Sequence, residues 1–132
     1  MKLARTGSQK RVLVIEDDRA IREMLCAALH DEGYATDSAG DGMEGLNRAA
    51  ATDPDVVLLD YAMPRCNGAD FAARYRLLPH HAPIILITAA YGLVERCREV
   101  HADGCLGKPF DLDDLLDAVA RHGGAPSDAA AA

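Results

Sequence analysis

The sequence lacks any hydrophobic run long enough to cross a bilayer. Its longest aliphatic runs, Val12 to Ile15, Val56 to Leu59 and Ile84 to Ile87, are four residues each, whereas a membrane-spanning helix needs about 20 apolar residues. The N-terminus also lacks the apolar segment of a secretory signal. We therefore expect a protein that does not insert into a membrane and that works in the cytoplasm.

The sequence also lacks an excess of basic residues. Its 14 lysines and arginines stand against 21 acidic residues, for a formal net charge of -7. This is the wrong sign for a domain that follows a phosphate backbone, so we expect no nucleic-acid binding by this chain alone. Composition leaves open where the acidic excess lies, because a solvated acidic face and an acidic pocket contribute equally to the net charge.

Cysteine is sparse and never occurs as a Cys-x-x-Cys pair. All four cysteines fall within segments of regular apolar periodicity: Cys26, Cys66, Cys97 and Cys105. The pattern is typical of reduced, small core residues in a cytosolic protein, and it favours neither a disulfide framework nor a zinc site. Met24 and Met43 are likewise predicted to fill the core. The five histidines are predicted at the surface, near helix ends or in loops: His30, His80, His81, His101 and His122.

What the sequence does contain is an alternation of aliphatic runs and helical patterns in 132 residues, enough for one domain. Strands are predicted at 12–15, 56–59 and 84–87, with a weaker one at 35–39 and a short apolar segment at 105–106. Helices are predicted from 19 to a stop at Gly33, at 43–50, 69–78 and 93–100, and from 111 onward, where Leu112, Leu115, Leu116 and Val119 form the apolar face. The runs are too apolar to have a wet face, so we predict an α/β fold with a parallel sheet between helices.

Polar residues follow these strands where each one ends. Glu16 and Asp17 follow the first run, Asp60 follows the third predicted strand, and Thr88 and Lys108 follow the last two. In a parallel sheet such residues gather at one edge. Carboxylates brought together raise one another's pKa unless a cation lies among them. Oxygen ligands suit Mg²⁺, and zinc finds no histidine or cysteine at these positions.

This constellation predicts phosphoryl chemistry. A carboxylate beside Mg²⁺ can attack phosphorus and form an acyl phosphate. Lys108 can pair with a phosphoryl oxygen, and the Thr88 hydroxyl can donate to another. Taken singly, each residue has an ordinary interpretation: Asp18 as a helix cap, Glu16 and Asp17 as solvated acids, and Thr88 as a strand-end residue. The joint pattern favours the functional interpretation.

Four segments in this order resemble the receiver domain of two-component response regulators (the CheY-like family). They are Val12 to Asp18, Leu58 to Gly68 with its Leu-Leu-Asp-Tyr-Ala-Met-Pro run, Ile87 to Ala89, and Lys108 to Phe110. The resemblance covers about Lys10 to Arg121. It implies a flavodoxin-like, doubly wound five-stranded parallel sheet in the order 2-1-3-4-5 with five helices.

The resemblance also implies roles for the site residues. Asp60 would accept a phosphoryl group from a sensor histidine kinase or a histidine phosphotransfer protein, which makes the chain a signalling receiver rather than an enzyme. Thr88 and Lys108 would bind the phosphoryl oxygens, and the Lys108-Pro109 bond is expected to be cis. The implied Mg²⁺ ligands are Asp17, Asp60 and the backbone carbonyl of Ala62, with Glu16 acting largely through water.

Two departures from the family pattern keep alternatives open. Cys105 occupies the position where the family usually has an aromatic residue, and the interval from Thr88 to Lys108 is shorter than usual. They suggest, as an alternative, a degenerate receiver that acts as a phosphorylation-independent docking module. An aspartyl-nucleophile phosphatase or mutase would need a second acid two positions after Asp60, where this sequence has Ala62.

The same resemblance bounds one domain, and composition describes the segments on either side of it. We expect a flexible lead-in at 1–10, a receiver domain at 11–121 and an Ala/Gly-rich tail at 122–132. That tail is unfit for an output module. Output is therefore expected to act through a separate downstream protein, or the chain is a fragment of a longer one.

Overall fold

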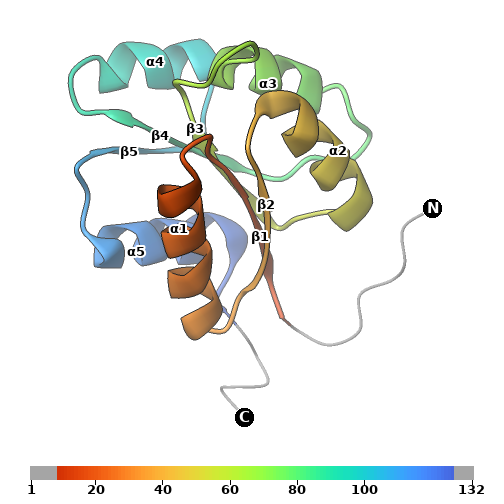
Figure 1. The fold of residues 1–132 in the computed structure, drawn as a ribbon, viewed down its shortest axis with the longest axis vertical. Helices are drawn as coiled ribbons and strands as arrows, with labels where there is room; N and C mark the ends of the chain where they lie inside the picture. Colours follow the sequence, from red (N-terminus) through yellow and green to blue (C-terminus); the bar gives the residue numbers. More distant parts are fainter. Residues whose placement is uncertain (1–8, 127–132) are drawn as a thin grey trace.

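The computed structural model describes residues 9–126, in which five strands and five helices alternate. The strands are β1 Arg11–Ile15, β2 Ala35–Ala39, β3 Val56–Asp60, β4 Ile84–Ala89 and β5 Gly104–Lys108. The helices are α1 Arg19–Asp31, α2 Gly42–Thr52, α3 Gly68–Tyr75, α4 Leu93–Val100 and α5 Leu112–Gly123. All strand pairs are parallel, in the order β2-β1-β3-β4-β5 (Figure 1). The predicted fold class is confirmed.

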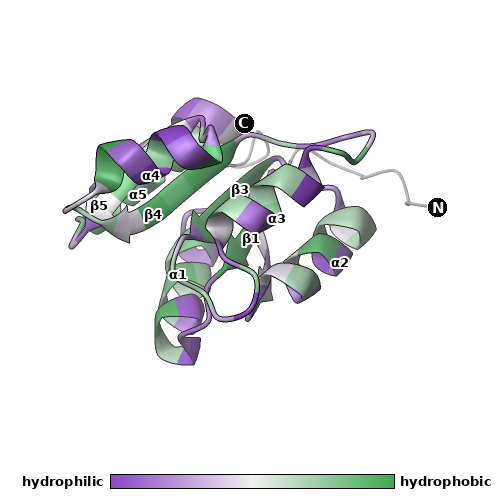
Figure 2. Ribbon diagram, turned by 90° about the horizontal axis from the view of Figure 1, so that it is seen from above, coloured by the Kyte–Doolittle hydropathy of each residue, from purple (hydrophilic) through white to green (hydrophobic). Residues whose placement is uncertain are grey.

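The aliphatic runs form the middle of the sheet because helices cover both of its faces (Figures 1 and 2). One face packs against α2, α3 and α4 through the side chains of Leu13, Ile15, Val57, Leu59, Ile84 and Leu86. The other packs against α1 and α5 through Val12, Val14, Val56, Leu58, Ile85 and Ile87. Successive strand residues point to opposite faces, so a run without polar residues serves two cores. The edge strands β2 and β5 are only partly buried.

The start of α1 agrees with the predicted helix boundary, whereas the end of α3 differs from it. The Asp18 side chain accepts a hydrogen bond from the Ile21 backbone N–H at 3.0 Å and caps α1, as predicted. The predicted end of α3 at residue 78 is wrong, because this helix ends at Tyr75. The chain instead tightens into turns, with the Leu77 N–H bonded to the Arg74 carbonyl. Residues just before a proline, here Pro79, disfavour helical geometry.

Three predicted core residues lie at the surface. Met24, Met43 and Leu112 are about half exposed, at 51%, 52% and 44%. Apolar residues at helical spacing are not all buried, because the part of α1, α2 and α5 that faces the sheet is narrower than the apolar periodicity suggests. The acidic residues Asp113 and Asp117 of α5 are exposed, as expected for a solvated face.

The cysteines divide into two kinds. Cys97 of α4 and Cys105 of β5 are joined in a disulfide, so the prediction that all four are reduced is wrong for this pair. Their sequence separation of eight residues offered no motif, and only the crossover from α4 to β5 brings them together. Cys26 and Cys66 are free thiols.

The structure defines part of the predicted terminal segments. Residues 1–8 and 127–132 lie outside the described residues. Two described residues of the predicted segments 1–10 and 122–132 are in contact, because the Lys10 backbone N–H donates to the Pro126 carbonyl at 3.2 Å. The Lys10 carbonyl accepts a hydrogen bond from the Ala35 backbone N–H at 2.9 Å. Among the described residues, no helix has the length and apolar character needed to cross a membrane.

Candidate functional site

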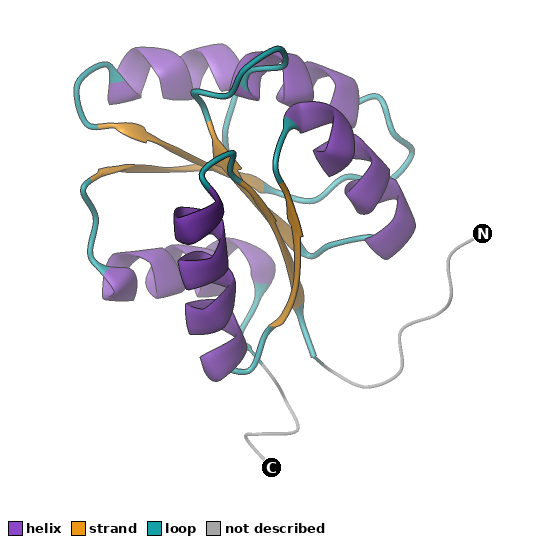
Figure 3. Cartoon of the chain, in the orientation of Figure 1, coloured by secondary structure: helices purple, strands orange, loops and turns teal. Residues whose placement is uncertain are grey.

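The predicted site residues lie at the carboxyl ends of parallel strands, which the register of the sheet aligns with one another. Ile15 pairs with Leu59, which places Glu16 beside Asp60 at the carboxyl end of the sheet. Asp60 is the last residue of β3, and Lys108 is the last residue of β5. Parallel register therefore brings together side chains that are 44 to 92 positions apart in the chain. Figure 3 shows the loops that leave these strand ends toward the helices.

Three acidic side chains form a cluster at this edge. One oxygen from each of Glu16, Asp17 and Asp60 can be chosen so that all lie within 4.8 Å of one another. Glu16 and Asp60 are buried, at 3% and 5% exposure, while Asp17 is open to solvent. Oxygen ligands with one open side fit a hard cation that keeps some of its water, such as Mg²⁺. Among the described residues this is the only such group of metal-binding side chains.

Lys108 supplies the positive charge within the cluster. Its Nζ lies 3.0 Å from Asp60 Oδ1 and 3.5 Å from Glu16 Oε1. The shorter contact is a charge-assisted hydrogen bond in which the ammonium donates to the Asp60 carboxylate. One lysine cannot neutralise three acids, so the cluster keeps a net negative charge that a divalent cation would offset.

The excess of negative charge and the burial of the cluster shift the pKa values of its residues. Burial, reinforced by the charge of Asp60, raises the pKa of Glu16 from 4.5 to about 7. Burial also raises the pKa of Asp60, although the hydrogen bond and charge of Lys108 oppose the rise. Burial alone would lower the pKa of Lys108, but its contacts with Asp60 and Glu16 raise it above the ordinary value. The charged forms of Glu16 and Asp60 are thus disfavoured, and a bound cation would stabilise them.

Backbone contacts hold Glu16 in place. Its Oε2 accepts a hydrogen bond from the Asp18 N–H at 3.2 Å. Its carbonyl accepts a hydrogen bond from Arg22 Nη1 at 2.7 Å, which ties the turn to the first part of α1. The turn that carries Asp17 is therefore tied to the N-terminal part of α1.

The remaining predicted residues lie at the same end of the sheet. Thr88, at 6% exposure, follows Ile87, the cross-strand partner of Asp60. Ala89 beside it is exposed, which leaves room in front of the strand. Ala62 is exposed in the loop after β3, and the Lys108-Pro109 peptide bond is cis, as expected.

A contact beside the site was not predicted. The Tyr61 hydroxyl donates to Glu99 Oε1 at 2.6 Å, and the Arg96 guanidinium carbon lies 4.1 Å from the centre of the Tyr61 ring. Both partners come from α4, so the residue after Asp60 touches this helix. No sequence signal could have indicated the contact, because it depends on how α4 packs beside the loop after β3.

The family model for the response regulator receiver domain matches residues 12–120 of the chain. Response regulator MprA of Mycobacterium avium (strain 104) is 40% identical over 108 residues, which make up 80% of this chain and 47% of that protein. The chain therefore spans about half the length of the curated relatives it matches.

Two solved structures are similar along most of the chain. Chemotaxis response regulator CheY4 of Vibrio cholerae superimposes with a TM-score of 0.79 and 33% identity, covering 86% of this chain and 98% of that one. Response regulator TrrA of Thermotoga maritima, in complex with Mg(2+)-BeF, has a TM-score of 0.77 and 34% identity over 86% and 98%.

Proposed function

We propose that this chain, which belongs to the family of response regulator receiver domains, accepts a phosphoryl group on Asp60 in a Mg²⁺-dependent reaction. The observation that carries the proposal is the buried Asp60 carboxylate, held 3.0 Å from Lys108 Nζ inside an acidic cluster. A buried acid that is paired with one lysine and crowded by two further acids has little structural value. The receiver domain is assigned to residues 11–121, in keeping with the family match over 12–120.

The metal ligands proposed are Asp17, Asp60 and the backbone carbonyl of Ala62, with Glu16 acting largely through water. The clustering of three carboxylates and the raised pKa of Glu16 support this assignment. The similar structure of TrrA was determined with Mg(2+)-BeF. Bound Mg²⁺ would neutralise charge on the carboxylates and on the incoming phosphoryl group.

Phosphoryl transfer would then proceed through residues of this chain. A carboxylate oxygen of Asp60 attacks phosphorus, an O–P bond forms, and the N–P bond of a phosphohistidine breaks. Lys108, already within reach of Asp60, pairs with a phosphoryl oxygen, and the Thr88 hydroxyl donates to another. The phosphoryl group thereby replaces a carboxylate oxygen as the partner of Lys108.

The partners are proposed only by class, because the chain spans 47% of the relative it matches. The phosphodonor is a sensor histidine kinase or a histidine phosphotransfer protein in the cytoplasm. Phosphorylation shifts the chain between two conformations that differ in affinity for a downstream protein. The alternative, a phosphorylation-independent docking module, is not favoured because the complete set of acids and Lys108 is assembled at the site.

The test is incubation with acetyl phosphate and Mg²⁺, followed by intact-mass spectrometry. We expect one added phosphoryl group on the wild type and none on Asp60→Asn. Asp117→Asn, which removes an exposed acid of α5, serves as the matched control and should be labelled like the wild type. Equal labelling of the wild type and Asp60→Asn would contradict the proposal. Complete lack of labelling and of any spectral response to beryllium fluoride would favour the docking module.

A further inference from the structure

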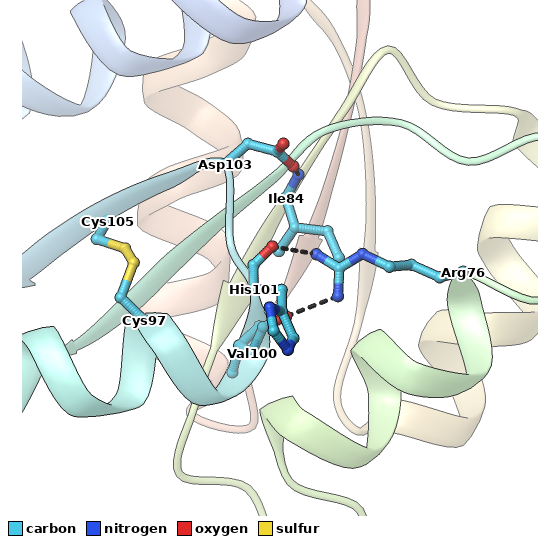
Figure 4. Close-up of a disulfide and its surroundings, with 7 residues drawn as sticks. All are labelled: Arg76, Ile84, Cys97, Val100, His101, Asp103 and Cys105. Carbon is cyan, nitrogen blue, oxygen red and sulfur yellow. Dashed lines mark hydrogen bonds between the residues drawn. A yellow bond between two sulfur atoms is a disulfide. The ribbon is translucent and has the colours of Figure 1, made fainter.

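We propose that Cys97 and Cys105 form a redox modification site that reacts by thiol–disulfide exchange with a small-molecule disulfide and reversibly fastens α4 to β5. The structure places a disulfide between the two elements (Figure 4). This bond is distinct from the phosphoacceptor Asp60 and would add a second modification to the chain.

The connection between α4 and β5 keeps the two cysteines close together by other means. Their Cα atoms are 6.2 Å apart, inside the range of about 4.4–6.8 Å typical of disulfides. Arg76 donates hydrogen bonds to the carbonyls of Val100 and His101 at 2.6 and 2.5 Å, at the end of α4. Asp103 Oδ2 accepts a hydrogen bond from the Ile84 backbone N–H at 2.8 Å. Because these contacts do not involve sulfur, the thiols stay positioned to re-form the bond after reduction.

The pair is also accessible. Cys97 and Cys105 line an open surface groove of about 450 Å³, whose other walls include Leu93, Val94, Arg98 and His101. A small disulfide can therefore reach the pair from solvent through this groove.

The other two cysteines are less suited to exchange. Cys66 is 7% exposed, and burial raises the pKa of both the Cys66 and the Cys26 thiols. A raised thiol pKa reduces the thiolate fraction at neutral pH and with it the rate of exchange. The chain therefore offers one paired, accessible dithiol together with two internal reference thiols.

The reaction proceeds in two exchange steps. One protein thiolate attacks a sulfur of the small disulfide, forms a mixed disulfide and releases one small thiol. The second protein thiol loses its proton and attacks the protein sulfur of that mixed disulfide, which releases the second small thiol. The protein loses two electrons and two protons, and the small disulfide is reduced to two thiols. In a reducing compartment, such a bond is expected to be transient rather than structural.

The bond joins elements next to the phosphoacceptor site. Cys105 lies on the strand that ends in Lys108, whose Nζ contacts Asp60. Cys97 lies on the helix that contacts Tyr61 through Arg96 and Glu99. Oxidation therefore restricts the motion of α4 against the edge strand, and reduction permits local opening of α4 while the Arg76 and Asp103 contacts keep its C-terminal end in place.

The experiment uses the full chain equilibrated in glutathione buffers of increasing oxidised fraction. After acid quenching, denaturation, alkylation and mass spectrometry, the number of alkylated cysteines should fall from four to two. Peptide mapping should locate the bond at Cys97 and Cys105, and transfer to reduced glutathione should restore all four thiols. Cys26→Ser is the matched control and should still form the bond.

The single variants Cys97→Ser and Cys105→Ser should form no internal bond and should accumulate a glutathione adduct on the remaining cysteine. Cys97→Ala provides a second variant should the serine disturb folding. Hydrogen exchange of α4 amides should be faster in the reduced protein.

Three results would contradict the modification site: four alkylated thiols throughout the titration, a bond mapped to another pair, or a bond that native reduction cannot open. Equal exchange of α4 in both states would overturn its fastening role. None of these readouts requires phosphorylation, so failure here is distinguishable from failure of the proposed function.

Discussion

Strands β1 and β3 lie in the middle of the sheet with helices over both faces, whereas β5 forms one edge and is partly exposed along its whole length. The helix beside that edge, α4, has one buried residue, Val100. It is held by the disulfide, by Arg76 at its end and by Tyr61 near its middle. The central region is thus stabilised by burial. The edge formed by α4 and β5, called the margin below, is held largely by a few polar contacts and one disulfide. A chemical event at the strand ends can therefore shift the margin at lower cost than the centre.

The largest expected difference between the two regions comes from matched truncations of leucine. Leu58→Ala in β3 should lower the free energy of unfolding by about 2–5 kcal/mol, because Leu58 is 1% exposed and a cavity would remain. Leu106→Ala in β5 should cost markedly less, because Leu106 is only partly buried against the same core. Urea denaturation followed by circular dichroism measures both. Equal losses would show that the margin is packed as tightly as the centre.

The next largest effect is an increase in stability on substitution of Glu16, an acidic residue at the carboxyl end of the central strand β1. Without Mg²⁺, Glu16→Gln should raise the free energy of unfolding by about 1–2 kcal/mol above neutral pH, because it removes a buried charge beside Asp60. The pKa of Glu16 rises from 4.5 to about 7 on folding, so the wild type should lose stability as the pH rises through this window. The variant should not show that loss. Thermal unfolding in EDTA across pH measures the difference.

The matched control for this effect is Asp117→Asn, which neutralises an exposed acid of α5 and should change stability by less than about 0.5 kcal/mol. A destabilised Glu16→Gln protein at alkaline pH would mean that the contact with Lys108 outweighs burial and repulsion. The cluster would then be a structural ion-pair network rather than a site that needs a cation.

The same two regions differ in how far the sequence predicts them. The central strands and the cluster of Glu16, Asp60 and Lys108 could be predicted, because uninterrupted aliphatic runs require cover on both faces and parallel strands align their polar ends. The bond between Cys97 and Cys105 could not be predicted, because it depends on the packing of α4 against an edge strand rather than on a local pattern. The Tyr61 contacts and the early end of α3 depend on packing in the same way.

A smaller effect concerns helix capping, which differs between α2 and α4. The Asp41 side chain accepts a hydrogen bond from the Glu44 N–H at 2.8 Å at the start of α2, whereas α4 begins at Gly92 with no side-chain cap. Asp41→Ala should cost about 1 kcal/mol in unfolding free energy. Asp111→Ala is the control, because Asp111 stands at the N-cap of α5 without a capping hydrogen bond and should cost less. Equal costs would assign the effect to helix dipole electrostatics instead.

The smallest effect on stability should come from Tyr61→Phe, which removes the hydroxyl bonded to Glu99 but keeps the ring under Arg96. The contact is exposed, so the free energy of unfolding should change by less than about 0.5 kcal/mol. Hydrogen exchange in α4 should nevertheless become faster, because this helix has few other contacts to hold it.

Tyr75→Phe makes the same change in the core, where the Tyr75 oxygen accepts a hydrogen bond from the Ala82 N–H at 2.7 Å. Leaving that donor unpaired should cost about 1–3 kcal/mol. If Tyr61→Phe leaves α4 exchange unchanged while Tyr75→Phe destabilises the whole chain, the Tyr61 hydroxyl does not hold α4. The link between α4 and the residue after Asp60 would then run through the contact of Arg96 with the Tyr61 ring.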